Sequence, residues 1–186
     1  MNDFNWIKDG VRVLMCTLRK KEGGKENRKE MHAQKKISTN RVEFMEIYNE
    51  MLANKKGGER IYCTINTRNI DKAIRKLKEI QLDNDYQPTE VRQHFYNDIH
   101  NKWISCLMKP SSRESAHFLI DIDNDDKNGL TLEMAENIVK GARVEILHKY
   151  STKNGYHLIT EPFNYAKTPL KKWDNVKVDG MVLLAY

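Results

Sequence analysis

The chain has 186 residues, of which 39% are hydrophobic and 31% charged, and its formal net charge is +6. Its 9 glycines and 4 prolines exclude collagen-like and low-complexity chains, and the apolar fraction is sufficient for a packed core. No apolar run approaches the roughly 18 residues that would cross a bilayer, so no membrane partner is expected.

The cysteines indicate a reducing compartment. Cys16, Cys63 and Cys106 are odd in number, widely spaced and outside any CxxC motif, which disfavours a disulfide framework and a cysteine-rich zinc site. The first residues also lack the order of a secretory signal. We therefore expect a cytoplasmic protein.

Positive charge is concentrated toward the N-terminus. Residues 1–60 carry 14 basic and 9 acidic side chains, whereas residues 111–186 carry 10 and 11. The cations of the most basic segment are Arg19, Lys20, Lys21, Lys25, Arg28, Lys29, Lys35 and Lys36. Such a segment favours a nucleic-acid backbone as partner, but a solvated segment without a partner explains the charge equally well.

In chain order, the front half predicts mainly helices. A polar cap at residues 38–40 begins a helix that ends near residue 54, and two further helices are expected over 70–81 and from about 89 to 106. Residues 60–67 alternate and are β-branched, which predicts a strand.

The back half predicts mainly strands. These are residues 116–123, a hairpin of 144–151 and 155–161, and a last strand over 176–184, with one helix from Thr131 to about residue 141.

This order predicts an α+β fold in which helices pack on a mixed, mostly antiparallel sheet. We expect a basic helical N-terminal region over residues 1–59 and a core over residues 60–186, together forming one compact domain.

Asp121 and Asp123 are the first candidate site residues. Residues two apart in a strand share a face, so both carboxylates project together after an apolar run. A divalent cation would neutralise them, although a hydrated strand end explains them equally well. The stretch 124–129 resembles a calcium loop, but its twelfth position is Ala135 where a glutamate is needed, so calcium is disfavoured.

The hairpin turn supplies the second candidate site. Ser151, Thr152 and Lys153 offer two hydroxyls and a cation, and His157 follows on the outgoing strand beside the open position Gly155. These donors suit a triphosphate, and the alternative is an ordinary turn with a surface histidine.

Asp179 is the third candidate, because a lone carboxylate is unexpected in an apolar strand. It either completes a metal site with Asp121 and Asp123 or takes part in an ion pair with Lys177, which shares its strand face.

The order of these motifs resembles the catalytic core of the archaeo-eukaryotic primase superfamily, which includes primase-polymerases and the polymerase domain of bacterial end-joining ligases. The matching stretches are FLIDID (118–123), STKNGYHLI (151–159), KVDGM (177–181) and the opening strand RIYCTINTR (60–68).

The resemblance implies an RRM-like sheet and a nucleotidyltransferase that joins NTPs or dNTPs on single-stranded DNA. Asp121, Asp123 and Asp179 would hold two Mg²⁺ or Mn²⁺ ions, while Ser151, Thr152, Lys153 and His157 would hold the triphosphate. It further implies a partner helicase or replication protein of a phage or plasmid, acting in the host cytoplasm.

Two other functions remain open on the sequence. One is a metal-dependent nuclease or replication-initiator endonuclease, for which Tyr150 and Tyr156 are the available nucleophiles although no HxH ligand pair accompanies them. The other is a catalytically idle member of the same fold that binds nucleic acid.

Overall fold

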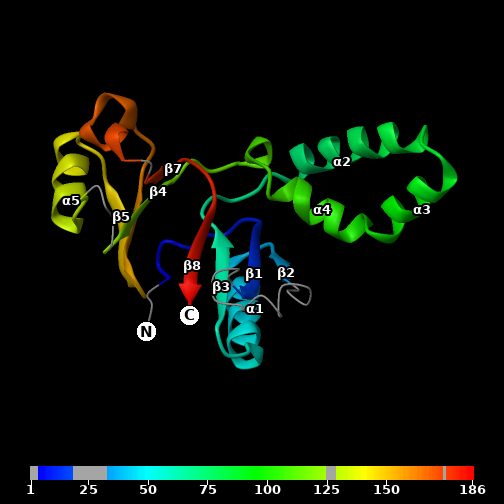
Figure 1. The fold of residues 1–186 in the computed structure, drawn as a ribbon, viewed down its shortest axis with the longest axis horizontal. Helices are drawn as coiled ribbons and strands as arrows, with labels where there is room; N and C mark the ends of the chain where they lie inside the picture. The colour runs from blue at the N-terminus through cyan, green and yellow to red at the C-terminus, as the bar shows by residue number, and fades with distance from the viewer. Residues whose placement is uncertain (1–3, 19–32, 125–128, 174) are drawn as a thin grey trace.

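The computed structural model describes residues 4–18, 33–124, 129–173 and 175–186. These residues form an α+β structure with two antiparallel four-stranded sheets and a separate helical arm (Figure 1). No helix among them is both long enough and apolar enough to span a membrane.

The first sheet combines the first and the last described strands of the chain. Its strands are β1 (Arg12–Leu18), β2 (Gln34–Ser38), β3 (Glu59–Thr64) and β8 (Met181–Ala185), in the order β2-β1-β3-β8. Helix α1 (Arg41–Asn54) covers it and begins at Asn40, whose side chain accepts a hydrogen bond from the backbone N–H of Glu43 at 2.9 Å. Phe44 and Met51 of α1 are buried in the core beneath.

The second sheet carries the sequence motifs. Its strands are β4 (Phe118–Asp123), β5 (Ile146–Thr152), β6 (Gly155–Thr160) and β7 (Val176–Lys177), in the order β5-β6-β4-β7. Helix α5 (Leu132–Gly141), capped by Thr131, packs on one face together with the 3₁₀ turns η3 (Tyr165–Lys167) and η4 (Pro169–Lys172). Leu119 and Ile159 on the other face join the core of the first sheet, so the two sheets pack against each other.

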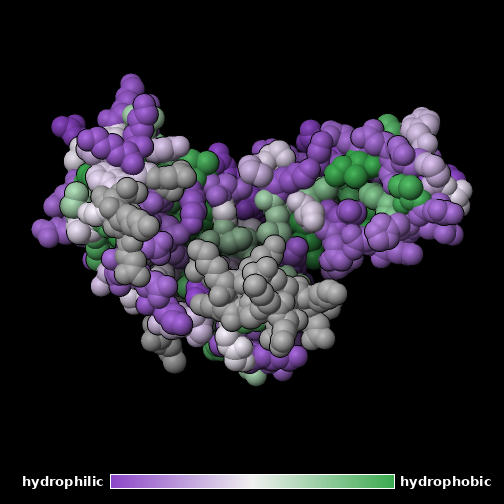
Figure 2. All heavy atoms as spheres, in the orientation of Figure 1, coloured by the Kyte–Doolittle hydropathy of each residue, from purple (hydrophilic) through white to green (hydrophobic). Residues whose placement is uncertain are grey.

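Helices α2 (Ile70–Asp85), α3 (Thr89–Asn97) and α4 (Ile99–Leu107), followed by the turn η2 (Pro110–Ser112), form an arm that projects to one side (Figure 1). Its base is fixed by a small core in which Val13 of β1 meets Ala73, Ile104 and Leu107 of the arm. Leu82, Tyr86 and Val91 of the arm are exposed, and Figure 2 shows hydrophobic patches on its mainly hydrophilic surface.

Several expected elements are confirmed, among them α1, α2, α5, the β5–β6 hairpin and strands β3 and β4. The segment expected as one helix from 89 to 106 is two helices, because the chain leaves helical geometry at Asp98 (φ −105°, ψ 14°).

The expectation of a helical region over residues 1–59 is wrong. Residues 12–38 contain the strands β1 and β2, and β1 pairs with β3 over residues 14–18. The first sheet therefore extends across the expected boundary at residue 60. The apolar run of residues 13–16 forms a strand because β3 and β2 pair with the backbone of β1 on its two sides.

The expected single sheet and the expected last strand over 176–184 are also corrected. That stretch divides between β7, which pairs with β4 in the second sheet, and β8, which pairs with β3 in the first. Residues 178–180 connect the two sheets, and Gly180 adopts a positive φ of 156° there.

Candidate functional site

The two aspartates of β4 lie on one face of the second sheet, as the sequence predicts. In the ladder between β4 and β6, Asp121 is opposite His157 and Asp123 is opposite Gly155. Ile120 and Ile122 alternate with them and are buried on the α5 side. The alternation of β4 therefore places both carboxylates beside the histidine of the neighbouring strand.

His157 is in contact with two hydrogen-bonding groups and is 6% exposed. Its Nε2 lies 3.0 Å from Asp121 Oδ1 and its Nδ1 lies 2.8 Å from the hydroxyl oxygen of Tyr150, which in turn donates to the carbonyl of Leu183 at 2.9 Å. Because the hydroxyl hydrogen of Tyr150 is donated to Leu183, its oxygen is the atom that faces the Nδ1 of His157. This chain of contacts joins β4 to β8 across the two sheets.

Asp121 also receives a hydrogen bond from Lys177 of β7, with Nζ 2.5 Å from Oδ2. Partial burial of Asp121 opposes its ionisation, but the hydrogen bonds and charges of His157 and Lys177 outweigh it and hold the pKa of this carboxyl well below its usual range. Asp121 is therefore an anion with each oxygen already in contact with a donor.

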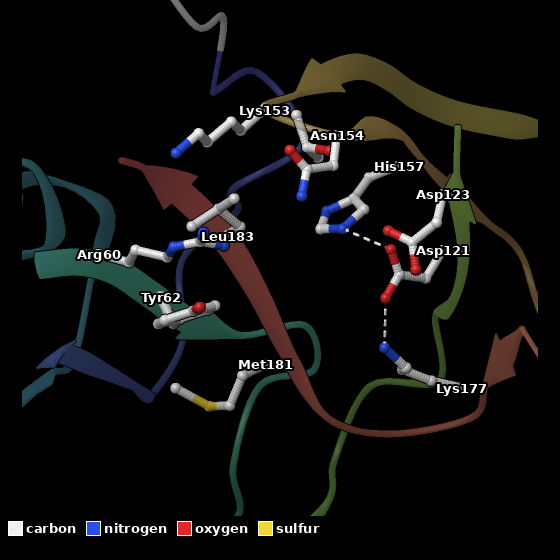
Figure 3. Close-up of a pocket in the computed structure, with 11 residues that line it drawn as sticks. Arg60, Tyr62, Asp121, Asp123, Lys153, Asn154, His157, Lys177, Met181 and Leu183 are labelled. Atoms are coloured by element: carbon white, nitrogen blue, oxygen red, sulfur yellow. Dashed lines mark hydrogen bonds and ion pairs between the residues drawn. The ribbon is translucent and has the colours of Figure 1, made fainter. Parts of the chain in front are cut away.

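Opposite these groups, strands β3 and β8 of the first sheet supply a second wall (Figure 3). The space between the walls, here called the inter-sheet pocket, has a volume of about 100 Å³. Its lining residues are Arg60, Tyr62, Asp121, Asp123, Thr152, Lys153, Asn154, His157, Lys177, Met181 and Leu183. Three of these are permanent cations and two are carboxylates, so positive charge predominates.

The turn residues divide between the two faces of the hairpin. Thr152 and Lys153 line the inter-sheet pocket together with Asp121 and His157, as the triphosphate prediction requires. Ser151 does not, because it pairs with Tyr156 on the face that carries α5, one residue out of phase with His157. The structure therefore does not bring Ser151 together with the other residues predicted to hold the triphosphate.

Gly155 has a structural role different from the one expected. A Cβ at this position would lie 1.8 Å from the carbonyl oxygen of Ile122, so the backbone of β4 already fills the space beside it. The glycine allows β4 and β6 to approach closely rather than leaving room for a phosphate.

Asp179 does not join Asp121 and Asp123. Its carboxylate accepts two hydrogen bonds of 2.8 Å from the guanidinium of Arg68, and Asn66 donates to it at 3.3 Å. Arg68 and Asp179 have side chains 1% and 6% exposed, respectively. Of the two alternatives left open by the sequence, an ion pair is therefore correct, but the partner is Arg68 and not Lys177. Among the described residues, no three His, Cys, Asp or Glu side chains are grouped to hold a metal ion.

The basic segment is only partly described. Arg19, Lys20, Lys21, Lys25, Arg28 and Lys29 lie outside the described residues. Lys35 and Lys36 are on β2, where the Nζ of Lys36 forms an ion pair with Glu50 of α1. The contact of the basic segment with nucleic acid stays a prediction.

Two tyrosines bear on the alternative of a replication-initiator endonuclease. Burial raises the pKa of Tyr150 well above its usual value, and its hydroxyl is engaged by His157 and Leu183. Tyr156 lies on the opposite face of β6 and packs with the α5 core. Neither side chain is placed as a nucleophile beside Asp121 and Asp123.

Sequence reasoning missed the pocket residues of the first sheet, above all Arg60 and Tyr62. The alternation of β3 predicts that Arg60 and Tyr62 share one face of the strand. That this face lies opposite β4 depends on how the two sheets pack, which the sequence pattern does not show.

Comparison of the chain with protein-family models, with curated proteins and with solved structures finds no significant match.

Proposed function

We propose that the protein is a metal-dependent nucleotidyltransferase that joins NTPs or dNTPs on a single-stranded DNA template, as a primase or primase-polymerase does. The observation that carries the proposal is the inter-sheet pocket, in which the carboxylates of Asp121 and Asp123 face Lys153, Arg60 and His157. Carboxylates for a divalent cation and cations for phosphate oxygens are the two requirements of nucleotidyl transfer.

The acidic side of the inter-sheet pocket fits Mg²⁺ or Mn²⁺. Such ions are commonly bound by one or two carboxylates, with phosphate oxygens and water completing the shell. Asp121 is ionised, and Asp123 has no hydrogen-bond or ion-pair partner within the described ranges. A bound ion would lower the pKa of the attacking hydroxyl and offset charge on the leaving pyrophosphate.

The basic side of the inter-sheet pocket fits a phosphate group. Lys153 and Arg60 approach from opposite walls, and His157 presents its ring between them and Asp121 (Figure 3). A volume of about 100 Å³ is well below the roughly 300–1,000 Å³ of pockets that enclose whole ligands. The phosphates would therefore enter the pocket, while the sugar and base lie outside it against the template.

The resemblance to archaeo-eukaryotic primases supports the same assignment, because Asp121, Asp123 and His157 lie together while coming from separate motifs. In this proposal the two sheets are the RRM-like catalytic core of that superfamily. A phage or plasmid replication system in a host cytoplasm, with a separate helicase or replication protein, would supply the template.

The proposal is tested by nucleotide incorporation. The protein is incubated with single-stranded DNA, with and without an annealed primer, in the presence of labelled NTPs or dNTPs and Mg²⁺ or Mn²⁺. We expect extended products that disappear in Asp121→Asn and in Asp123→Asn. Asp83→Asn, on the exposed surface of α2, is the matched control and should retain activity.

Two results would contradict the proposal. The first is the absence of products from the wild-type protein under every combination of nucleotide, metal and template. The second is undiminished incorporation by folded Asp123→Asn. The carboxylate of Asp123 has no other partner within the described residues, so this result would show that the cation does not bind it.

A second candidate is a nucleic-acid-binding protein of the same fold without catalytic activity. The pairing of Asp179 with Arg68 favours it, since one of the three carboxylates implied by the resemblance is committed elsewhere. This candidate predicts DNA binding that is independent of divalent cations and is unaffected by Asp121→Asn.

A further inference from the structure

We infer that the inter-sheet pocket takes one divalent cation rather than two, and that the ammonium group of Lys177 occupies the place beside Asp121 that a second cation would take. This inference rests on the proposed function, because it concerns the metal of the same site. It departs from the two-ion arrangement that the resemblance implies.

The first argument is the coordination of Asp121. Two-metal sites hold their ions about 3.5–4 Å apart, and a carboxylate that bridges them must offer one oxygen to each. Here Oδ2 of Asp121 is 2.5 Å from Lys177 Nζ, and Oδ1 is 3.0 Å from His157 Nε2. Each carboxylate oxygen has a further lone pair, so Asp121 can still contribute to one ion, but the ammonium charge beside Oδ2 opposes a second cation at that oxygen.

The second argument is the number of carboxylates. Asp179 would be the third ligand of a two-ion site, yet both of its oxygens are bonded to Arg68 within the protein. Asp123 is then the remaining acidic group of the inter-sheet pocket, and no side chain among the residues described forms a hydrogen bond or ion pair with its carboxylate. The carboxylate of Asp123, together with one oxygen of Asp121 that also accepts a hydrogen bond, can bind a single ion whose remaining ligands are phosphate oxygens and water.

The third argument is electrostatic. Lys177, Lys153 and Arg60 place three positive charges around two carboxylates before any ion binds. An ammonium group is a compact point charge, so Lys177 can offset developing phosphate charge where a second metal would otherwise do so. A second divalent ion at that place would be repelled by the ammonium at a distance of about 4 Å. Lys177 is thus an electrostatic substitute that also fixes the orientation of Asp121.

The test is a Mn²⁺ titration without nucleotide, followed by the electron paramagnetic resonance signal of free Mn²⁺ and by calorimetry. We expect one Mn²⁺ per wild-type chain. Lys177→Met removes the charge but keeps the length of the side chain, and it should bind Mn²⁺ about 10-fold more tightly or take up a second ion. Lys177→Arg retains the charge and should retain a single site. The matched control is Lys171→Met, an exposed lysine of η4.

Each outcome bears on a different claim. Two Mn²⁺ ions per wild-type chain, or a folded Lys177→Met that binds Mn²⁺ with wild-type affinity and number, would overturn the role of Lys177. Absence of Mn²⁺ binding by the wild-type protein, and by Lys177→Met as well, would instead overturn the metal of the proposed function. Urea unfolding of each variant confirms that differences in Mn²⁺ binding come from folded protein.

Discussion

Substituting Asp179 by asparagine separates a structural ion pair from a metal ligand. The side chain keeps its shape but loses its charge, and the guanidinium of Arg68 stays buried at 1% exposure. Arginine does not lose its proton in proteins, so the positive charge of Arg68 has no means of adapting. The asparagine also places an NH₂ group where one oxygen accepted a 2.8 Å hydrogen bond.

The expected loss is that of a buried pair from which one partner is removed, about 3–5 kcal/mol of unfolding free energy. With a urea dependence of about 2 kcal/mol per M, the unfolding midpoint of Asp179→Asn should fall by roughly 1.5–2.5 M. Asp123→Asn, at an exposed position, should move the unfolding free energy by no more than about 0.5 kcal/mol. The double variant Arg68→Met with Asp179→Leu should recover much of the loss, because it leaves no unpaired charge.

The measurement is urea unfolding followed by circular dichroism, combined with Mn²⁺ titration of each folded variant. We expect Asp179→Asn to lose stability and to keep Mn²⁺ affinity. A variant that unfolds at the wild-type urea concentration but binds Mn²⁺ poorly would refute the reasoning, and Asp179 would then be a metal ligand after all.

Two further predictions concern the second sheet. Gly155→Ala should lower the unfolding free energy by at least about 2 kcal/mol, because the new Cβ would collide with the carbonyl oxygen of Ile122. Gly57→Ala is the control and should be nearly neutral, since no atom lies within 4 Å of the Cβ position. Equal thermal unfolding temperatures of the two variants would contradict this prediction. Asp121, whose pKa is depressed in the folded state, stabilises the fold above its unfolded pKa of about 3.9 and loses this contribution as pH falls through its folded pKa. The stability gap between the wild type and Asp121→Asn should therefore be present at neutral pH and close in strong acid, and a gap that widens on acidification would show that the sign is wrong.

Local patterns predicted the parts of the fold whose partners are close in sequence. The β5–β6 hairpin is an example, because a short turn brings its strands together, and the caps at Asn40 and Thr131 are another. Strand β1 was missed because its place in the first sheet depends on β3, more than 40 residues later in the chain. The division of residues 176–184 between two sheets likewise follows from tertiary packing that an apolar run does not encode.

The candidate site shows the same limit. Alternation in β4 correctly placed Asp121 and Asp123 on one face, and the ladder to β6 added His157. The partner of Asp179 is Arg68, separated from it by 111 residues, and no periodicity relates the two. Likewise Ser151 appeared equivalent to Thr152 in sequence, but strand alternation places the two on opposite faces.

The connection between β7 and β8 makes Asp179 important to the inter-sheet pocket without placing it there. Lys177 lines the pocket just before this connection and Met181 lines it just after, while Arg68 secures the residue between them. The ion pair thereby holds the connection between the two walls in place. If the proposed activity holds, a mutational survey scored only by turnover would group Asp179 with Asp121 and Asp123, since a displaced wall and a missing ligand would give the same inactive phenotype. Measurements of folding and of cation affinity on one set of variants are what separate the two causes.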